Sequence, residues 1–166
     1  MKKSIQLRGY LGELICKKWL KNKYKGCRIV EQIRPKNYPT KGGPYLDFGV
    51  LNEEKKVIAI YEVKTQDYNL DTVNKALLFI WENGEKEFVV GNEEGEIYET
   101  TDEFQAYAVL LKKPSEKGKG CIKNIIYFEE ILKEINVSEI KEDILDEVNA
   151  DIEKEIESIL NIAKRK

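Results

Sequence analysis

Segment 57–65, VIAIYEVKT, carries apolar side chains at both odd and even positions before it ends on charged residues. Alternate residues of a β-strand point to opposite faces, so this segment predicts a strand that is apolar on both faces. Such a strand has to be covered on both sides, which places it inside a sheet rather than at a solvated surface. This requirement favours an α/β fold in which helices flank a mixed central β-sheet.

The neighbouring segments supply the helices and strands that such a sheet needs. Apolar residues spaced three to four apart predict helices, and short apolar runs between polar turns predict strands. The first expected elements are helix 4–24, strand 27–33, loop 34–44, strand 45–51, strand 57–65 and helix 70–84. Asp71 is the expected N-cap of that last helix and Gly84 its stop. The later elements are a hairpin of segments 87–91 and 96–100, segment 104–111 as helix or strand, and strand 121–128 leading into a helix.

The character of the chain changes near residue 128, where a strongly helical and acidic segment begins. One apolar stripe follows helical spacing through it and consists of Ile140, Ile144, Val148, Ile152, Ile156 and Ile159. We therefore predict a domain of residues 1–128 and an acidic helical extension of residues 129–166. The stripe favours an extension that packs on the domain or forms a dimer interface over a functional acidic arm.

The composition excludes several classes of site. The chain contains no histidine, which rules out histidine-ligated zinc, histidine general bases and Ser-His-Asp or Cys-His triads. Cys16, Cys27 and Cys121 are odd in number and lack CxxC spacing, so we interpret them as reduced thiols. Oxygen ligands suited to Mg2+ or Mn2+ remain available.

The distribution of apolar and charged residues bounds the location and partners of the protein. No run of 18 apolar residues is present, so we expect a cytoplasmic protein without a membrane partner. Residues 1–64 hold fifteen Lys and Arg against six Asp and Glu, whereas residues 65–166 hold thirteen against twenty-four. The basic half suits a polyanionic partner such as nucleic acid, although solvated lysine-rich faces are also common.

Three charged side chains stand where the pattern would otherwise place apolar residues. Glu62 and Lys64 continue one apolar row of their strand, and burying an isolated ion costs on the order of several kcal/mol. A direct Glu62–Lys64 ion pair would satisfy both groups. Asp47 lies on the preceding strand, which turn 52–56 joins as an antiparallel hairpin, so it is expected close to Glu62. Two carboxylates and one ammonium leave an excess negative charge that Mg2+ would balance.

The first helix adds a further acidic residue. Gly9 and Gly12 lie beside Glu13, and each glycine inside a helix costs about 1 kcal/mol relative to alanine. Two glycines in one turn indicate that this helix face approaches another part of the chain closely. Lys17 lies one turn after Glu13 on the same face. Glu13 is therefore expected to point toward the carboxylates, the alternative being a surface glutamate on a loose first turn.

These residues together resemble the PD-(D/E)xK nuclease superfamily, whose fold is that of many restriction endonucleases, Holliday-junction resolvases and repair nucleases. The matching parts are PYLD at 44–47, EVK at 62–64, and the helix glutamate Glu13 ahead of both. The order helix, three strands, helix and strand also matches, and the resemblance covers about residues 4–92. The family's proline directly precedes its aspartate, whereas Pro44 lies three positions before Asp47.

The resemblance implies a restriction-endonuclease-like core and a role for each matching residue. Asp47 and Glu62 become the ligands of Mg2+ or Mn2+, together with the Val63 carbonyl. Lys64 becomes the group that activates the attacking water or neutralises phosphate. The helix glutamate of the resolvase-like and some restriction branches corresponds to Glu13.

Several polar residues are candidates for contacts with nucleic acid. Arg34, Lys36 and Lys41 lie in or beside the loop that enters the Asp47 strand, where they are placed to grip backbone phosphate. Gln66 follows the Lys64 strand and is a candidate for contact with DNA, and Lys17 is a further candidate. The alternative for the loop is an ordinary solvated segment.

The leading hypothesis is a metal-dependent DNA endonuclease with a role in restriction, junction resolution or defence. Cutting both strands would require two sites, so a homodimer is expected, with the C-terminal helix as a candidate interface. One alternative is a non-catalytic module with this fold that binds nucleic acid or protein. A second alternative is an α/β domain in which the charges form a structural ion-pair network.

Overall fold

The computed structural model describes residues 2–40, 43–66, 73–93, 95–114, 123–136, 138 and 150–164. The described helices are α1 (Lys2–Lys23), α2 (Lys75–Asn83), α3 (Phe128–Glu134) and α5 (Ala150–Lys164). The described strands are β1 (Arg28–Pro35), β2 (Leu46–Leu51), β3 (Val57–Lys64), β4 (Glu87–Val90), β5 (Ile97–Leu110) and β6 (Ile125–Tyr127). The fold is therefore mixed α/β, as the pattern of the sequence predicts.

The strands form one mixed sheet in the order β3-β2-β1-β4-β5-β6. Antiparallel pairing joins β3 to β2, β2 to β1, β1 to β4 and β4 to β5, whereas β5 runs parallel to both β3 and β6. Because β5 is 14 residues long, its first residues pair with β4 and its last residues pair with β3. This double pairing closes β1, β2, β3, β5 and β4 into a small barrel, which the sequence pattern does not predict.

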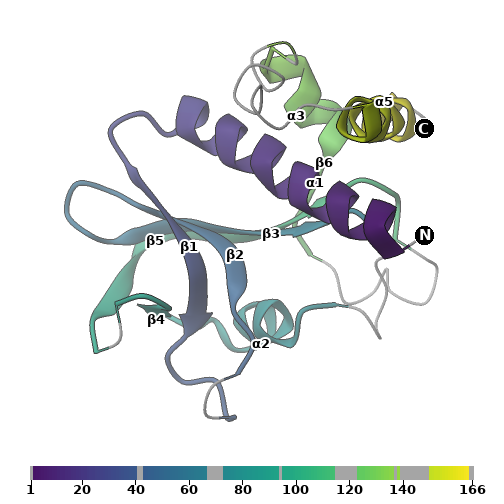
Figure 1. The fold of residues 1–166 in the computed structure, drawn as a ribbon. Coiled ribbons are helices and arrows are strands. Elements are labelled where there is room, and N and C mark those ends of the chain that lie inside the picture. Colours follow the sequence, from purple (N-terminus) through teal and green to yellow (C-terminus); the bar gives the residue numbers. More distant parts are fainter. Residues whose placement is uncertain are drawn as a thin grey trace.

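Helices cover β3 on both sides, as the two apolar faces of the strand require (Figure 1). Helices α1, α3 and α5 lie on one side of the sheet and α2 lies on the other. Ala59 and Tyr61 belong to the core beneath α1, whereas Val57 and Ile60 belong to the core beneath α2. Strict alternation would place Val57 with Ala59, and this detail is wrong because the β3 register shifts between these two residues.

The start of α2 corrects one expectation. The helix begins at Lys75 and not at residue 70, and its N-cap is Asn74, whose side chain accepts a hydrogen bond from the Ala76 amide. The expected cap, Asp71, lies outside the described residues. Gly84 ends the helix with a φ of 65° and donates its amide to the Ile80 carbonyl, as expected for a C-terminal glycine.

Two further elements resolve open points of the sequence. Segment 104–111, which fits a helix or a strand by its pattern, is strand through Leu110 because it forms the β3-paired half of β5. The expected hairpin of segments 87–91 and 96–100 is present as β4 and the start of β5.

The C-terminal helix α5 packs on α1. Ile156 and Ile159 of the expected stripe are buried in the core that includes α1, and Arg8 forms an ion pair of 2.5 Å with Glu155. Arg8 also donates to the Ser158 hydroxyl at 2.9 Å. The stripe residues Ile140, Ile144 and Val148 lie outside the described residues. No helix in the described part of the chain is long and apolar enough to cross a membrane.

Candidate functional site

Asp47 and Glu62 meet at the open end of the β2–β3 hairpin. The ladder pairs Phe48 with Tyr61, so the residues next to this pair, Asp47 and Glu62, lie side by side. The Asp47 amide donates to Glu62 Oε1 at 3.2 Å, and the Val63 amide donates to Asp47 Oδ2 at 2.8 Å. Each carboxylate therefore accepts a backbone hydrogen bond from the opposite strand, which fixes both side chains at this position. The expected proximity of the two residues is confirmed.

Asn74 holds Glu62 from the other side, and sequence reasoning missed this residue. Its Nδ2 donates to Glu62 Oε2 at 2.5 Å and to the Tyr45 carbonyl at 3.0 Å. Its Oδ1 caps α2 by accepting from the Ala76 amide at 2.8 Å. One asparagine thus joins the helix terminus to the carboxylate. The preference for asparagine at an N-cap next to an apolar run was the available signal.

Helix α1 brings Glu13 to the same place. The Glu13 carboxyl group lies within hydrogen-bonding reach of the Asp47 carboxyl group. The close approach expected from the glycines is confirmed at Gly12, where an added Cβ would lie 2.5 Å from Thr65 Cγ2. The absence of a side chain at Gly12 therefore lets α1 rest directly on the end of β3, with Glu13 beside the hairpin.

Asp47 interacts with both of the other carboxyl groups. Burial, reinforced by the negative charge of Glu62, raises the pKa of Asp47 to about 8. Burial and the adjacent Asp47 raise the pKa of Glu13 to about 7, and burial also raises the pKa of Glu62. Desolvated carboxylates that share a site cannot all ionise without an added positive charge. At neutral pH the cluster therefore retains protons that a cation could replace.

Lys64 does not form the simple ion pair that would make the cluster purely structural. Among the described residues, no direct ion pair joins Lys64 to Glu62, although its charge lowers the pKa of that carboxyl group. Lys64 instead lines a cavity of about 340 Å³ at the junction of α1 and the end of β3, together with Glu13, Val63 and Gln66. Lys64 and the Glu13 carboxylate thus border a space that a ligand can enter.

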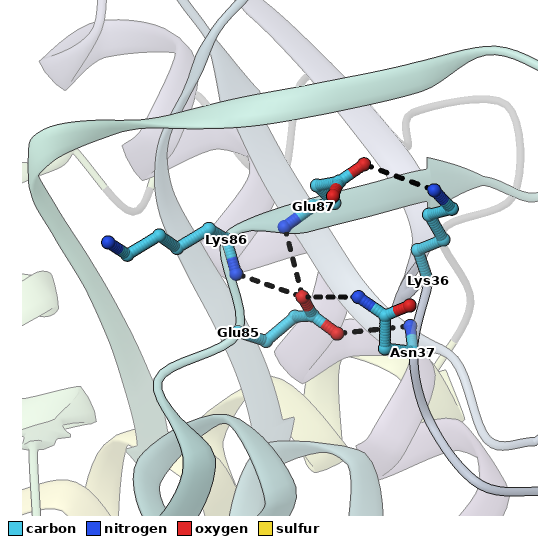
Figure 2. A network of polar contacts seen from close by, with 5 residues as sticks. All are labelled: Lys36, Asn37, Glu85, Lys86 and Glu87. Atoms are coloured by element: carbon cyan, nitrogen blue, oxygen red, sulfur yellow. Dashed lines mark hydrogen bonds and ion pairs between the residues drawn. The ribbon is translucent and has the colours of Figure 1, made fainter.

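Lys36, a predicted phosphate contact, belongs to a different network (Figure 2). Its ammonium pairs with Glu87 on β4 at 3.2 Å. The next residue, Asn37, donates its amide and its side chain to the carboxylate of Glu85, which also accepts from the Lys86 and Glu87 amides. Glu85 is buried and accepts four hydrogen bonds, so it fastens the segment after β1 to the start of β4.

The other predicted nucleic-acid contacts differ in their surroundings. Gln66 is exposed and borders the cavity, whereas Lys17 pairs with Glu31 at 3.3 Å. The Arg34 guanidinium lies over the Tyr45 ring at 5.6 Å, and its buried Nε has no hydrogen-bond partner among the described residues. Lys41 lies outside the described residues. The structure therefore brings Gln66 to the cavity and leaves Lys36 in a separate network.

The donor set suits a hard divalent cation. Asp47 and Glu62 offer carboxylate oxygens, and Mg2+ in proteins is commonly held by one or two carboxylates while it keeps several waters. Within the described residues, no group of three or more Asp, Glu or Cys side chains is arranged to hold a metal ion. The resemblance implies a smaller protein contribution, namely two carboxylates and the Val63 carbonyl, with water or phosphate completing the shell.

Comparison with known proteins finds no matching family model, no matching curated protein and no matching solved structure. The activity of the site is therefore inferred from its own geometry and chemistry.

Proposed function

We propose that the protein is a metal-dependent DNA endonuclease that hydrolyses phosphodiester bonds with Mg2+ or Mn2+. The observation that carries the proposal is the cluster of Glu13, Asp47 and Glu62 beside a cavity lined by Lys64. No described lysine or arginine forms a direct ion pair with any of these three carboxylates. A cluster with no direct counter-ion among the described side chains is better suited to an exchangeable cation than to a permanent structural network.

Asp47, Glu62 and the Val63 carbonyl are the proposed ligands. A bound divalent cation supplies Lewis acidity toward a phosphodiester oxygen and favours ionisation of a bound water. The hydrogen bonds that Asp47 and Glu62 accept from the Val63 and Asp47 amides fix the two carboxylates before a cation arrives. Asn74 holds the second oxygen of Glu62 and sets its orientation.

Lys64 and Glu13 are the proposed groups that act on water and phosphate. The Lys64 ammonium supplies positive charge and hydrogen-bond donors at the cavity, where it can hold the attacking water or neutralise the phosphate. Glu13 borders the same cavity next to Asp47, where its carboxyl group can exchange a proton with a bound water.

The fold supports the assignment of a restriction-endonuclease-like core. Helix α1, the strands β1 to β3, helix α2 and strand β4 follow the order of elements that the resemblance implies over residues 4–92. The proposal extends to DNA as the substrate, because the basic residues are concentrated in the first 64 positions. It also extends to a homodimer, because cutting two strands requires two sites.

The test is cleavage of supercoiled plasmid and of a four-way junction with Mg2+ or Mn2+, by wild type, Asp47→Ala and Lys64→Ala. The expected result is metal-dependent cutting by wild type that falls at least about a hundredfold in both variants. Glu54→Gln, in the exposed β2–β3 turn, is the matched control and should cut as wild type does. The preferred substrate separates junction resolution from restriction.

Calorimetric titration of Mg2+ and Mn2+ into the same samples separates the alternatives. DNA binding without metal binding or cutting would favour a non-catalytic binding module. Absence of cutting, metal binding and DNA binding would leave the three carboxylates as a structural cluster and would overturn the proposal.

A further inference from the structure

The second wall of the cavity is a face of α1 of which the proposed chemistry uses only Glu13. Gln6, Gly9 and Tyr10 border the cavity together with Glu13, and their spacing of three and four places all four on one helix face. Tyr10 is 49% exposed. Among the described residues, the other large apolar side chain with similar exposure is Ile97, far along the chain. An exposed aromatic ring therefore stands at the mouth of the cavity, next to Glu13.

Gly9 is not explained by packing. An added Cβ at Gly9 would lie 4.0 Å from Thr65 Oγ1, an ordinary contact, whereas the same addition at Gly12 would clash with Thr65. Alanine would thus fit at position 9 and would favour the helix by about 1 kcal/mol. Gly9 borders the cavity, as Tyr10 and Lys64 do. The helix therefore carries, at the wall of the cavity, a glycine that close packing does not require.

We propose that the cavity receives one unpaired nucleotide of a DNA strand, with its base stacked on Tyr10 and its phosphate beside Lys64. This inference rests on the proposed endonuclease function and names the substrate class as single-stranded or locally unpaired DNA. Stacking on an aromatic side chain is tolerant of base identity and stabilises binding of unpaired strands. The amide side chains of Gln6 and Gln66 stand at the same cavity and can donate to and accept from base edges.

The size of the cavity supports a single nucleotide rather than a base pair. Its volume of about 340 Å³ lies at the lower end of the range of pockets that hold small-molecule ligands. A base of continuous duplex would have to leave its stack to enter, and unstacking opposes binding. Unpaired DNA is therefore the substrate that reaches Lys64 and the carboxylates without this cost.

The test compares binding of a 12-nucleotide oligothymidine with binding of a blunt 12-base-pair duplex, by fluorescence anisotropy with Ca2+ in place of Mg2+. The expected result is tighter binding of the single strand by wild type and a loss of roughly 5- to 100-fold in Tyr10→Ala. Tyr10→Phe keeps the ring and should remain within about twofold of wild type. Gly9→Leu fills the cavity with a residue that favours helix, so it should also lose single-strand affinity while its melting temperature is kept or raised.

Ile97→Ala is the matched control, because Ile97 is 48% exposed and does not border the cavity. Its affinities should equal those of wild type. Equal single-strand affinity in wild type and Tyr10→Ala, or equal affinity of wild type for duplex and single strand, would overturn the inference.

Cleavage by the same proteins with Mg2+ distinguishes failure of the inference from failure of the proposed function. Metal-dependent cutting that is lost in Asp47→Ala but unchanged in Tyr10→Ala on every substrate overturns the Tyr10 contact and leaves the endonuclease. Tyr10-dependent binding of the single strand without any cutting overturns the endonuclease and leaves the nucleotide pocket.

Discussion

At the scale of single residues, burial and the closeness of like charges favour the protonated forms of Asp47 and Glu13. Burial and Glu62 raise the pKa of Asp47 to about 8, and burial and Asp47 raise the pKa of Glu13 to about 7. In an unfolded chain these groups would titrate near pH 4. Between the pKa values of the unfolded chain and those of the folded protein, the folded state binds more protons than the unfolded state. The free energy of unfolding therefore falls as pH rises through this range.

The first prediction concerns stability without metal. We expect the melting temperature in EDTA to fall between pH 5 and pH 8, by an amount equivalent to about 1–3 kcal/mol. Asp47→Asn removes one titrating group from the cluster and should flatten this dependence and raise the melting temperature at pH 8. Thermal unfolding followed by circular dichroism at pH 5, 6.5 and 8 measures both effects.

Mg2+ provides the internal check on this prediction. It should raise the melting temperature of wild type at pH 8 more than at pH 5, because protons compete with the cation for the same oxygens. Asp47→Asn should show little response, and Glu54→Gln should respond as wild type does. An unchanged pH dependence in Asp47→Asn would show that this carboxyl group does not titrate as described.

At the scale of elements, the contact between α1 and the end of β3 positions the site. Gly12 lies against Thr65, which is 5% exposed, and the same contact places Glu13 beside the β2–β3 hairpin. The two glycines of this helix differ in how closely other residues pack against them. Gly12 is required by close approach to Thr65, whereas Gly9 borders the cavity and an added Cβ there would make only an ordinary contact.

The second prediction therefore separates two substitutions that helix propensity alone would treat alike. Gly9→Ala should raise the free energy of unfolding by up to about 1 kcal/mol. Gly12→Ala should lower it by about 1–3 kcal/mol, because the new Cβ meets Thr65 Cγ2 at 2.5 Å. Urea unfolding curves measure both changes.

The double variant Gly12→Ala with Thr65→Ser tests the cause. Serine lacks the Cγ2 methyl group that the new Cβ would meet. Adding Gly12→Ala to Thr65→Ser should therefore lower the free energy of unfolding much less than adding Gly12→Ala to wild type. Additive losses in the two substitutions would mean that Thr65 is not the obstacle.

At the scale of the whole molecule, two cores on opposite sides of the sheet hold the barrel and its helices together. One core joins α1, α3 and α5 to residues of β2, β3 and β5, and the other joins α2 to residues of β1, β2, β3, β4 and β5. The C-terminal helix contributes Ile156 and Ile159 to the first core and fastens itself to α1 through Arg8 and Glu155. Because α1 also carries Glu13, the packing of α5 supports the helix that borders the site.

The third prediction follows from this packing. Ile159 is fully buried, so Ile159→Ala should lower the free energy of unfolding by about 2–5 kcal/mol. The exposed Ile97 is the matched control, and Ile97→Ala should change stability by less than about 0.5 kcal/mol. Denaturant unfolding at one pH measures both, and equal effects at the two positions would contradict the packing of α5 on α1.

Local patterns in the sequence were sufficient for much of the fold and for part of the site. The two apolar faces of β3 require layers on both sides, and both layers are present. The short turn after β2 forces a hairpin, which is why the proximity of Asp47 and Glu62 could be predicted. The glycine pair in α1 indicated a close approach, which occurs at Gly12. Each of these features depends on residues that are near one another in the chain or on a simple periodicity.

Other features were decided only when distant segments came together. Closure of the barrel depends on which partners the two halves of β5 find, and strand periodicity does not encode partners. The role of Asn74 depends on where the start of α2 lies relative to Glu62, and the cavity at Tyr10 depends on how α1 crosses β3. The strand faces and the pairing of the hairpin carboxylates could be read from the sequence, because local geometry fixes them. The raised pKa values of the carboxyl cluster, the absence of a direct Glu62–Lys64 pair and the open cavity could not, because burial and hydrogen-bond partners arise from packing between remote segments.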